Sequence, residues 1–188
     1  ESRVDMLQLN LIVGSGGILS HAPRRVQSLL MMVDAYEPLG FTELAVDSIF
    51  MMPHLGVLST VDEKAATDVF VRDCLIYLGT CVAPIGQGVW GERCADYTIT
   101  LTNSKDAAPP PVIKGTLKFG ELRLYPLAAG EEAAVSITPA RAVDVGAGRG
   151  VPVERRARGG VVGLVLDGRG RPLQLPVKQD ERVRALKE

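Results

Sequence analysis

The chain has 188 residues, of which 46% are apolar and 23% are charged, and its formal net charge is −1. This composition supports a folded core and fits one large or two small domains. A charge so close to zero gives no global reason to expect nucleic acid or an anionic membrane as a partner. No apolar run approaches the roughly 18 residues of a membrane-spanning helix, and we expect a cytoplasmic protein.

The chain ends and the cysteines suggest the origin of the chain and its compartment, but they do not predict a reactive site. The sequence begins with ESRVD, without an initiator Met or a signal-peptide pattern, and stops within the helix-like RVRALKE, so we expect a piece of a longer protein. Cys74, Cys81 and Cys94 lack the spacing of a zinc site, and three buried thiols suit a reducing compartment. Neither these cysteines nor the two histidines predict a metal site.

A strand, a glycine turn and a helix are predicted near the start of the chain. Apolar and polar residues alternate over residues 7–13, which is the spacing of a strand. A helix over residues 20–35 follows, with Ser20 as its N-cap. The turn between them consists of Gly14, Ser15, Gly16 and Gly17. Such a turn offers backbone N–H groups to a phosphate or nucleotide, but glycines also serve tight turns for geometry alone.

The next strand is predicted over residues 44–46 and ends at Asp47. A carboxylate in this position can hold a magnesium-bound water or a ribose hydroxyl, or it can cap the turn that follows. Beyond it, Pro53 and Gly56 argue against one continuous helix. His54 has no nucleophile and orienting acid nearby, so we do not expect a hydrolase site there.

A helix and a change of composition follow. The T-x-x-E pattern from Thr60 to Glu63 predicts a capping box at the start of this helix. Proline and glycine then punctuate residues 82–91, where we place a domain boundary. The expected domains are an α/β portion, residues 1–85, and a β-rich part, residues 86–188.

Short strands are predicted throughout the second half. Alternating patterns place them near residues 97–101, 117–119, 122–124 and 135–137. Residues 161–166 and 173–177, joined by a turn at 167–170, have the pattern of a β-hairpin. Strands at this spacing are typical of a small all-β barrel or sandwich.

Arginine is concentrated near the end of the chain. Between residues 141 and 172, seven arginines stand against three acids, a local excess of four positive charges (7 − 3). This excess indicates either a solvated face or a docking surface for an acidic partner or nucleic acid. No aromatic residues lie between the arginines to stack on bases, so the solvated face is favoured and nucleic acid is not expected.

The chain resembles the accessory proteins of glutamate mutase (methylaspartate mutase) in GSGGILSHAPRR, LAVDSIFMMPHLGVLST and GGVVGLVLDGRGRPLQLP. That family is known as MutL or GlmL and is unrelated to the mismatch-repair protein that shares the first name. The resemblance runs over nearly the whole chain. Family members are similar to the acetate kinase, Hsp70 and actin ATPases, whose two lobes close on ATP.

The resemblance implies a fold, a ligand and a partner. Residues 1–85 would form an α/β portion of the second lobe of an actin/Hsp70-like ATPase, followed by the small all-β barrel or sandwich. The full-length protein would bind ATP or ADP with Mg²⁺ and reactivate an adenosylcobalamin-dependent mutase subunit. The nucleotide-binding residues carried over are Gly14, Ser15, Gly16, Gly17 and Arg24, with Asp47 as a residue of the cleft.

The same resemblance limits what this chain does alone. The first-lobe phosphate motif of the superfamily has no candidate here, so the full-length protein is the expected ATPase and this piece is expected to be inactive. No catalytic residue and no metal ligand is assigned. The chain also lacks a B12-binding Asp-x-His-x-x-Gly pattern. The alternative is a non-catalytic interaction module that docks through its β part and its arginines, with a purely structural glycine turn.

Overall fold

A computed structural model describes residues 5–102, 110–173 and 179. The strands are β1 (Leu11–Gly14), β2 (Gly40–Asp47), β3 (Leu75–Ala83), β4 (Arg93–Leu101), β5 (Val112–Lys118), β6 (Leu122–Tyr125), β7 (Glu132–Pro139), β8 (Val153–Arg158) and β9 (Gly163–Asp167). The helices are η1 (Met6–Gln8), α1 (Gly17–Ser20), α2 (Arg25–Tyr36), α3 (Met52–Leu58), α4 (Glu63–Val69) and η2 (Phe70–Cys74). No helix in the described ranges is long and apolar enough to cross a membrane.

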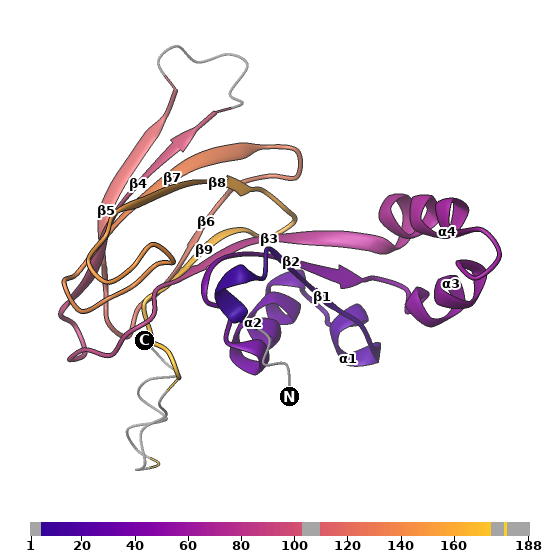
Figure 1. The fold of residues 1–188 in the computed structure, drawn as a ribbon, viewed down its shortest axis with the longest axis horizontal. Coiled ribbons are helices and arrows are strands. Elements are labelled where there is room, and N and C mark those ends of the chain that lie inside the picture. Colours follow the sequence, from indigo (N-terminus) through magenta and orange to yellow (C-terminus); the bar gives the residue numbers. More distant parts are fainter. Residues whose placement is uncertain (1–4, 103–109, 174–178, 180–188) are drawn as a thin grey trace.

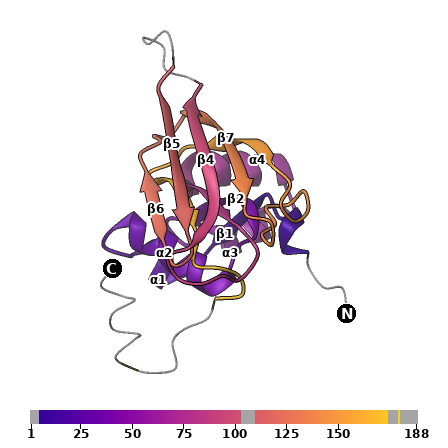
Figure 2. The same ribbon diagram turned by 90° about the vertical axis from the view of Figure 1, so that its left-hand side faces the viewer.

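The strands form two sheets, and α2 lies against one of them (Figure 1). The five-stranded sheet has the order β1-β2-β3-β9-β6 and mixes parallel and antiparallel pairs. The four-stranded sheet has the order β5-β4-β7-β8 and is antiparallel throughout. Figure 2 shows the long β4 and β5 of the second sheet in front of the first.

Side chains of β9 alternate between two apolar cores. Leu164 and Leu166 belong to the core between the two sheets, whereas Val165 belongs to the core beneath α2. Alternate residues of a strand point to opposite faces, so both faces of β9 are covered. This explains why its sequence, GLVLD, is apolar up to the final aspartate. The α2 side of the second core consists of Leu29, Met32 and Val33.

The β2–β3 pair carries α3, α4 and η2 at the end far from the four-stranded sheet (Figure 1). We call residues 48–74 the α3–α4 unit. Its own small core consists of Leu55, Ala66 and Cys74. Pro53 lies in the first turn of α3, where a missing N–H is tolerated, so a helix forms where the sequence argued against a continuous one.

The start of α4 corrects the predicted capping box. The N-cap is Asp62, whose Oδ1 accepts a hydrogen bond from Ala65 N at 2.9 Å. Thr60 instead donates its hydroxyl to Val57 O at 2.8 Å, at the end of α3. Aspartate is at least as good an N-cap as threonine, and Asp62 stands directly before the first helical residue.

The strands of the β-rich second half are divided between the two sheets. The expected division at residue 85 falls between β3 and β4, and the strands predicted near residues 97–101, 117–119 and 135–137 belong to the four-stranded sheet. The fourth strand of this sheet, β8, was not predicted. β6 and β9 instead complete the sheet of the first half, with β9 beside β3. A strand as apolar as β9 needs cover on both faces, which this position supplies.

The hairpin predicted at residues 161–177 also has a different outcome. β9 pairs with β3 and β6. Beyond it, Arg171 forms an isolated bridge with Gly86, and Leu173 N donates to Glu37 Oε2 at 2.9 Å. Residues 174–177 of the predicted second strand lie outside the described residues.

Candidate functional site

The glycine turn lies where β1 ends and leads directly into α1. β1 is parallel to β2, and Gly14 aligns with Val46, so the carboxyl ends of the two strands meet at one edge of the sheet. Ligands of open α/β sheets bind at such edges. The helix predicted over residues 20–35 corresponds to α2, which begins only at Arg25. Ser20 is not its N-cap, as predicted, but the last residue of the separate short helix α1, and Arg24 is the N-cap of α2.

The three glycines of the turn have different roles. A Cβ on Gly14 would lie 2.6 Å from Leu19 Cδ1 and 3.0 Å from Met32 Sδ, so a side chain here would displace the ends of these two side chains. Gly16 has φ 118° and ψ 156°, a conformation essentially restricted to glycine. No described atom lies within 4 Å of a Cβ built on Gly16 or Gly17. The turn therefore combines one packed glycine with two whose backbone a ligand can approach closely.

Asp47 lies beside the turn, at the end of β2. Ser15 Oγ donates to Asp47 Oδ2 at 3.1 Å, so two of the predicted site residues are in contact. The same carboxylate accepts the backbone N–H of Met51 at 3.1 Å and of Met52 at 2.8 Å. Asp47 thus caps the turn before α3, which is one of the two roles that the sequence left open.

The environment of the Asp47 carboxylate keeps it ionised. Its side chain has no exposed surface. Burial raises its pKa, but hydrogen bonds from the Met52 and Met51 amides and from the Ser15 hydroxyl outweigh this and hold the pKa below its ordinary value. Both oxygens accept hydrogen bonds in this arrangement, so the carboxylate holds together the glycine turn and the start of α3.

Arg24 is exposed at the start of α2. Its backbone N–H donates to Gln27 Oε1 at 3.1 Å, and Gln27 N donates to Arg24 O at 2.9 Å. The neighbouring Arg25 turns back toward α1, where its Nη1 donates to Ser20 O at 2.9 Å. Among the described residues, no hydrogen bond or ion pair joins Arg24 to Ser15 or to Asp47.

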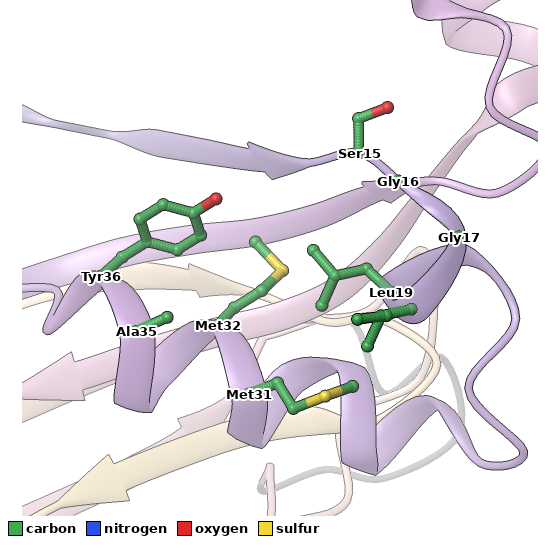
Figure 3. A pocket seen from close by; sticks show the side chains of 9 residues that line it. Ser15, Gly16, Gly17, Leu19, Met31, Met32, Ala35 and Tyr36 are labelled. Atoms are coloured by element: carbon green, nitrogen blue, oxygen red, sulfur yellow. The ribbon is translucent and has the colours of Figure 1, made fainter.

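A cavity of about 360 Å³ opens beside the turn (Figure 3). This volume is within the range of about 300–1,000 Å³ typical of small-molecule sites. Leu19 from α1 and Met32 and Tyr36 from α2 surround the same space in Figure 3. The full lining is Ser15, Gly16, Gly17, Ile18, Leu19, Met31, Met32, Ala35 and Tyr36. Most of these side chains are apolar, so the cavity suits a flat, weakly polar ring.

Sequence reasoning predicted the glycines of this wall but not its helical side. Met31 and Ala35 are apolar residues on the outer part of α2. The helical spacing of apolar residues does not distinguish those that line a cavity from those that pack in the core. The signal that could have found them is their spacing of four, which places both on one face of the helix next to the turn.

The other reactive side chains do not form a site. Cys74, Cys81 and Cys94 are buried free thiols. Burial raises the pKa of Cys81 to about 12 and of Cys94 to about 11, so both are protonated at neutral pH and poor nucleophiles. His54 is exposed on α3. Within the described parts of the chain, no group of three or more His, Cys, Asp and Glu side chains is placed to bind a metal ion.

The seven arginines do not form one surface. Arg169 and Arg171 contact the buried Asp167 at 2.9 and 2.7 Å, and Arg171 is only 3% exposed. Outward-facing members are engaged as well, in the contacts Arg158–Tyr77 (3.7 Å to the ring centroid), Arg158–Glu43 (3.8 Å) and Arg156–Glu132 (3.6 Å). The cluster is therefore neither wholly solvated nor a continuous basic docking face.

Comparison with known proteins links the first part of the chain to a family. Residues 2–74 match the model of a family described as MutL protein. No match was found among curated proteins or among solved structures. The matched region contains the glycine turn, Asp47 and the α3–α4 unit. It supports the resemblance to the MutL accessory proteins of glutamate mutase over the part of the chain that carries the candidate site.

Proposed function

We propose that this chain belongs to an ATP-dependent accessory factor that reactivates an adenosylcobalamin-dependent mutase of the glutamate mutase type. The observation that carries this proposal is the MutL family match over residues 2–74. That match suggests the accessory role. The assignment of a nucleotide, and of the mutase subunit as partner, rests in addition on the resemblance to two-lobed ATPases and on the geometry of the glycine turn.

The glycine turn and its cavity would take the adenosine side of ATP or ADP. The open backbone of Gly16 and Gly17 allows a ribose or phosphate to approach the main chain. The apolar cavity beside them suits the base, which would lie against Leu19 and Tyr36. The lining offers few polar side chains, so the base would be selected mainly by shape and stacking.

Supplying the adenosine side of a nucleotide cleft, and not hydrolysis, is the role we assign to this chain. Hydrolysis needs carboxylates that hold magnesium and orient water, together with loops that cradle the phosphates. The acid nearest the turn, Asp47, is buried and occupied by Ser15 and the α3 amides. ATP hydrolysis by the longer protein would therefore require residues outside this site.

The proposal is tested by calorimetric titration of Mg-ADP and Mg-ATP into this chain and into the longer protein that contains it. The native backbone of Gly16, with φ 118°, is one that valine rarely adopts, so Gly16→Val must strain or shift the turn, and we expect binding to be about ten-fold weaker or more. Gly130→Val is the matched control, because Gly130 also has a positive φ (87°) and open space around it, but lies away from the site. Equal affinity in Gly16→Val and in the control would contradict the proposal.

Exposed apolar residues favour a second function, a module that binds a partner protein without nucleotide. On the α3–α4 unit, Val57 is 72% exposed and Val61 is 87% exposed. In this case the glycine turn is only a structural element, and association with a mutase subunit would be the same with and without ATP. Sedimentation of the mixed proteins in both conditions separates the two functions.

A further inference from the structure

Three segments of the chain meet at Asp47. Ser15 Oγ donates to its carboxylate at 3.1 Å, and Ser20 Oγ donates to its backbone carbonyl at 2.5 Å. These two serines begin and end the segment that contains Gly16 and the short helix α1, so one residue of β2 anchors both ends of that segment. Between the anchors, the glycine backbone is left facing open space.

The carboxylate of Asp47 also accepts hydrogen bonds from the start of the α3–α4 unit. Met51 N donates to Oδ1 at 3.1 Å, and Met52 N donates to Oδ2 at 2.8 Å. Oδ2 therefore accepts from Ser15 and from Met52 at the same time. Because two donors share one oxygen, a change in the position of the Ser15 hydroxyl alters the hydrogen bond that remains for the Met52 amide.

The residue just before these amides has an unusual backbone. Phe50 has φ 58°, which is rare for a bulky side chain, and it is 47% exposed. Such a conformation persists when its surroundings hold it, and here the two residues that follow are fixed by Asp47. The α3–α4 unit otherwise encloses its own small core and lies at the far end of the β2–β3 pair (Figure 1).

We propose that Asp47 is a positioning residue that couples the glycine turn to the α3–α4 unit. A ligand that draws the Ser15 hydroxyl away from Oδ2 changes the hydrogen bonds between Asp47 and the amides of Met51 and Met52. This in turn changes the position of the preceding residue, Phe50. The identity of that ligand, a nucleotide phosphate or ribose, rests on the proposed function. The coupling between the two segments does not, because it is built into the protein without ligand.

The coupling is tested first in the protein alone, by amide hydrogen exchange at single residues. Ser15→Ala removes one donor to Asp47, and we expect exchange of the Met51 and Met52 amides to change by about five-fold, the effect of one hydrogen bond. Ser59→Ala is the matched control, since its hydroxyl donates only to Gly56 O within α3. Ser15→Thr restores a hydroxyl and should restore the wild-type rates.

Unchanged exchange of both amides in Ser15→Ala, or the same change in Ser59→Ala, would overturn the coupling whatever the ligand. The second arm adds Mg-ADP to the wild-type chain and records calorimetric heat together with exchange. Heat accompanied by altered exchange at Met51 and Met52 supports the proposal that ligand binding at the glycine turn changes the start of the α3–α4 unit. Heat without such a change rejects it. Absence of heat, both in this chain and in the longer protein that contains it, contradicts the nucleotide assignment and leaves the ligand-free comparison to decide the coupling.

Discussion

Two buried aspartates end strands of the five-stranded sheet, and their charges are stabilised in different ways. Asp47 ends β2 and Asp167 ends β9, and neither has exposed surface. Because β2 is antiparallel to β3 and β3 is parallel to β9, the two residues lie at opposite edges. Asp167 contacts the guanidinium groups of Arg169 and Arg171, whereas Asp47 accepts only neutral N–H and O–H donors.

This difference separates a structural acid from one that can respond to a ligand. Removing one partner of a buried ion pair leaves an uncompensated charge, so the Asp167 cluster is fixed in place. Arg171 also donates to Pro38 O at 3.3 Å, which ties the segment after β9 to the end of α2. Each donor to Asp47 is a single neutral hydrogen bond, which water or a ligand can replace at modest cost. The type of partner, and not burial alone, distinguishes the two.

The largest effect is expected from Asp167→Asn. The asparagine cannot neutralise Arg171, whose charge would remain buried, so the free energy of unfolding should fall by about 3–5 kcal/mol. Urea denaturation of the purified chain measures this loss. Asp34→Asn is the control, because Asp34 also contacts Arg169, at 2.8 Å, but is more than half exposed. Similar losses in both variants would show that burial of the pair is unimportant.

Asp47→Asn should destabilise the chain less, by about 1–2 kcal/mol. The asparagine keeps one carbonyl oxygen for the α3 amides, and no buried positive charge is left without a partner. The same urea measurement applies. A loss as large as that of Asp167→Asn would mean that neutral donors fix Asp47 as firmly as arginines fix Asp167, and the contrast between the two sites would fail.

A smaller effect, shared by both acids, is expected in the pH dependence of stability. Asp47 and Asp167 each have a folded-state pKa below the ordinary value of 3.8. The unfolded state therefore binds protons more readily, and the stabilising contribution is full above about pH 4 and is lost as the pH falls through the folded-state pKa. Unfolding free energies measured from neutral to acid pH should fall less steeply in Asp47→Asn and Asp167→Asn. Curves parallel to wild type would contradict this.

The glycine turn and the strand that ends at Asp47 could be predicted because both are local patterns. Alternating apolar residues, glycines and a terminal acid occur within a few positions of one another. The strand over residues 7–13 was predicted too long, since η1 occupies its first part and β1 begins at Leu11. The cap of α4 was misassigned because two good capping residues, Thr60 and Asp62, stand close together and spacing alone does not choose between them.

The rest depends on contacts between distant residues. The sequence of β9 does not predict that its neighbours in the sheet are β3 and β6. Its apolar residues predict only that both faces of the strand are covered. The contact of Arg171 with Pro38 joins residues 133 positions apart. Because of contacts like this one, Arg171 is a buried structural group, although it belongs to a stretch with an excess of positive charge. Composition alone does not predict this burial. The cavity beside the turn likewise requires the packing of α1 against α2.

The smallest effect should come from Arg156→Ala on β8, which extends the comparison to ion pairs at the surface. Arg156 is 3.6 Å from Glu132 and mostly exposed, so its loss should change the free energy of unfolding by less than about 0.5 kcal/mol. Arg158→Ala, on the same strand, should cost more, up to about 1 kcal/mol, because its guanidinium stacks on Tyr77 at 3.7 Å. Urea denaturation of the two variants side by side gives the ranking. If Arg156→Ala were the more costly, the outward arginines would belong to a network stronger than isolated surface pairs.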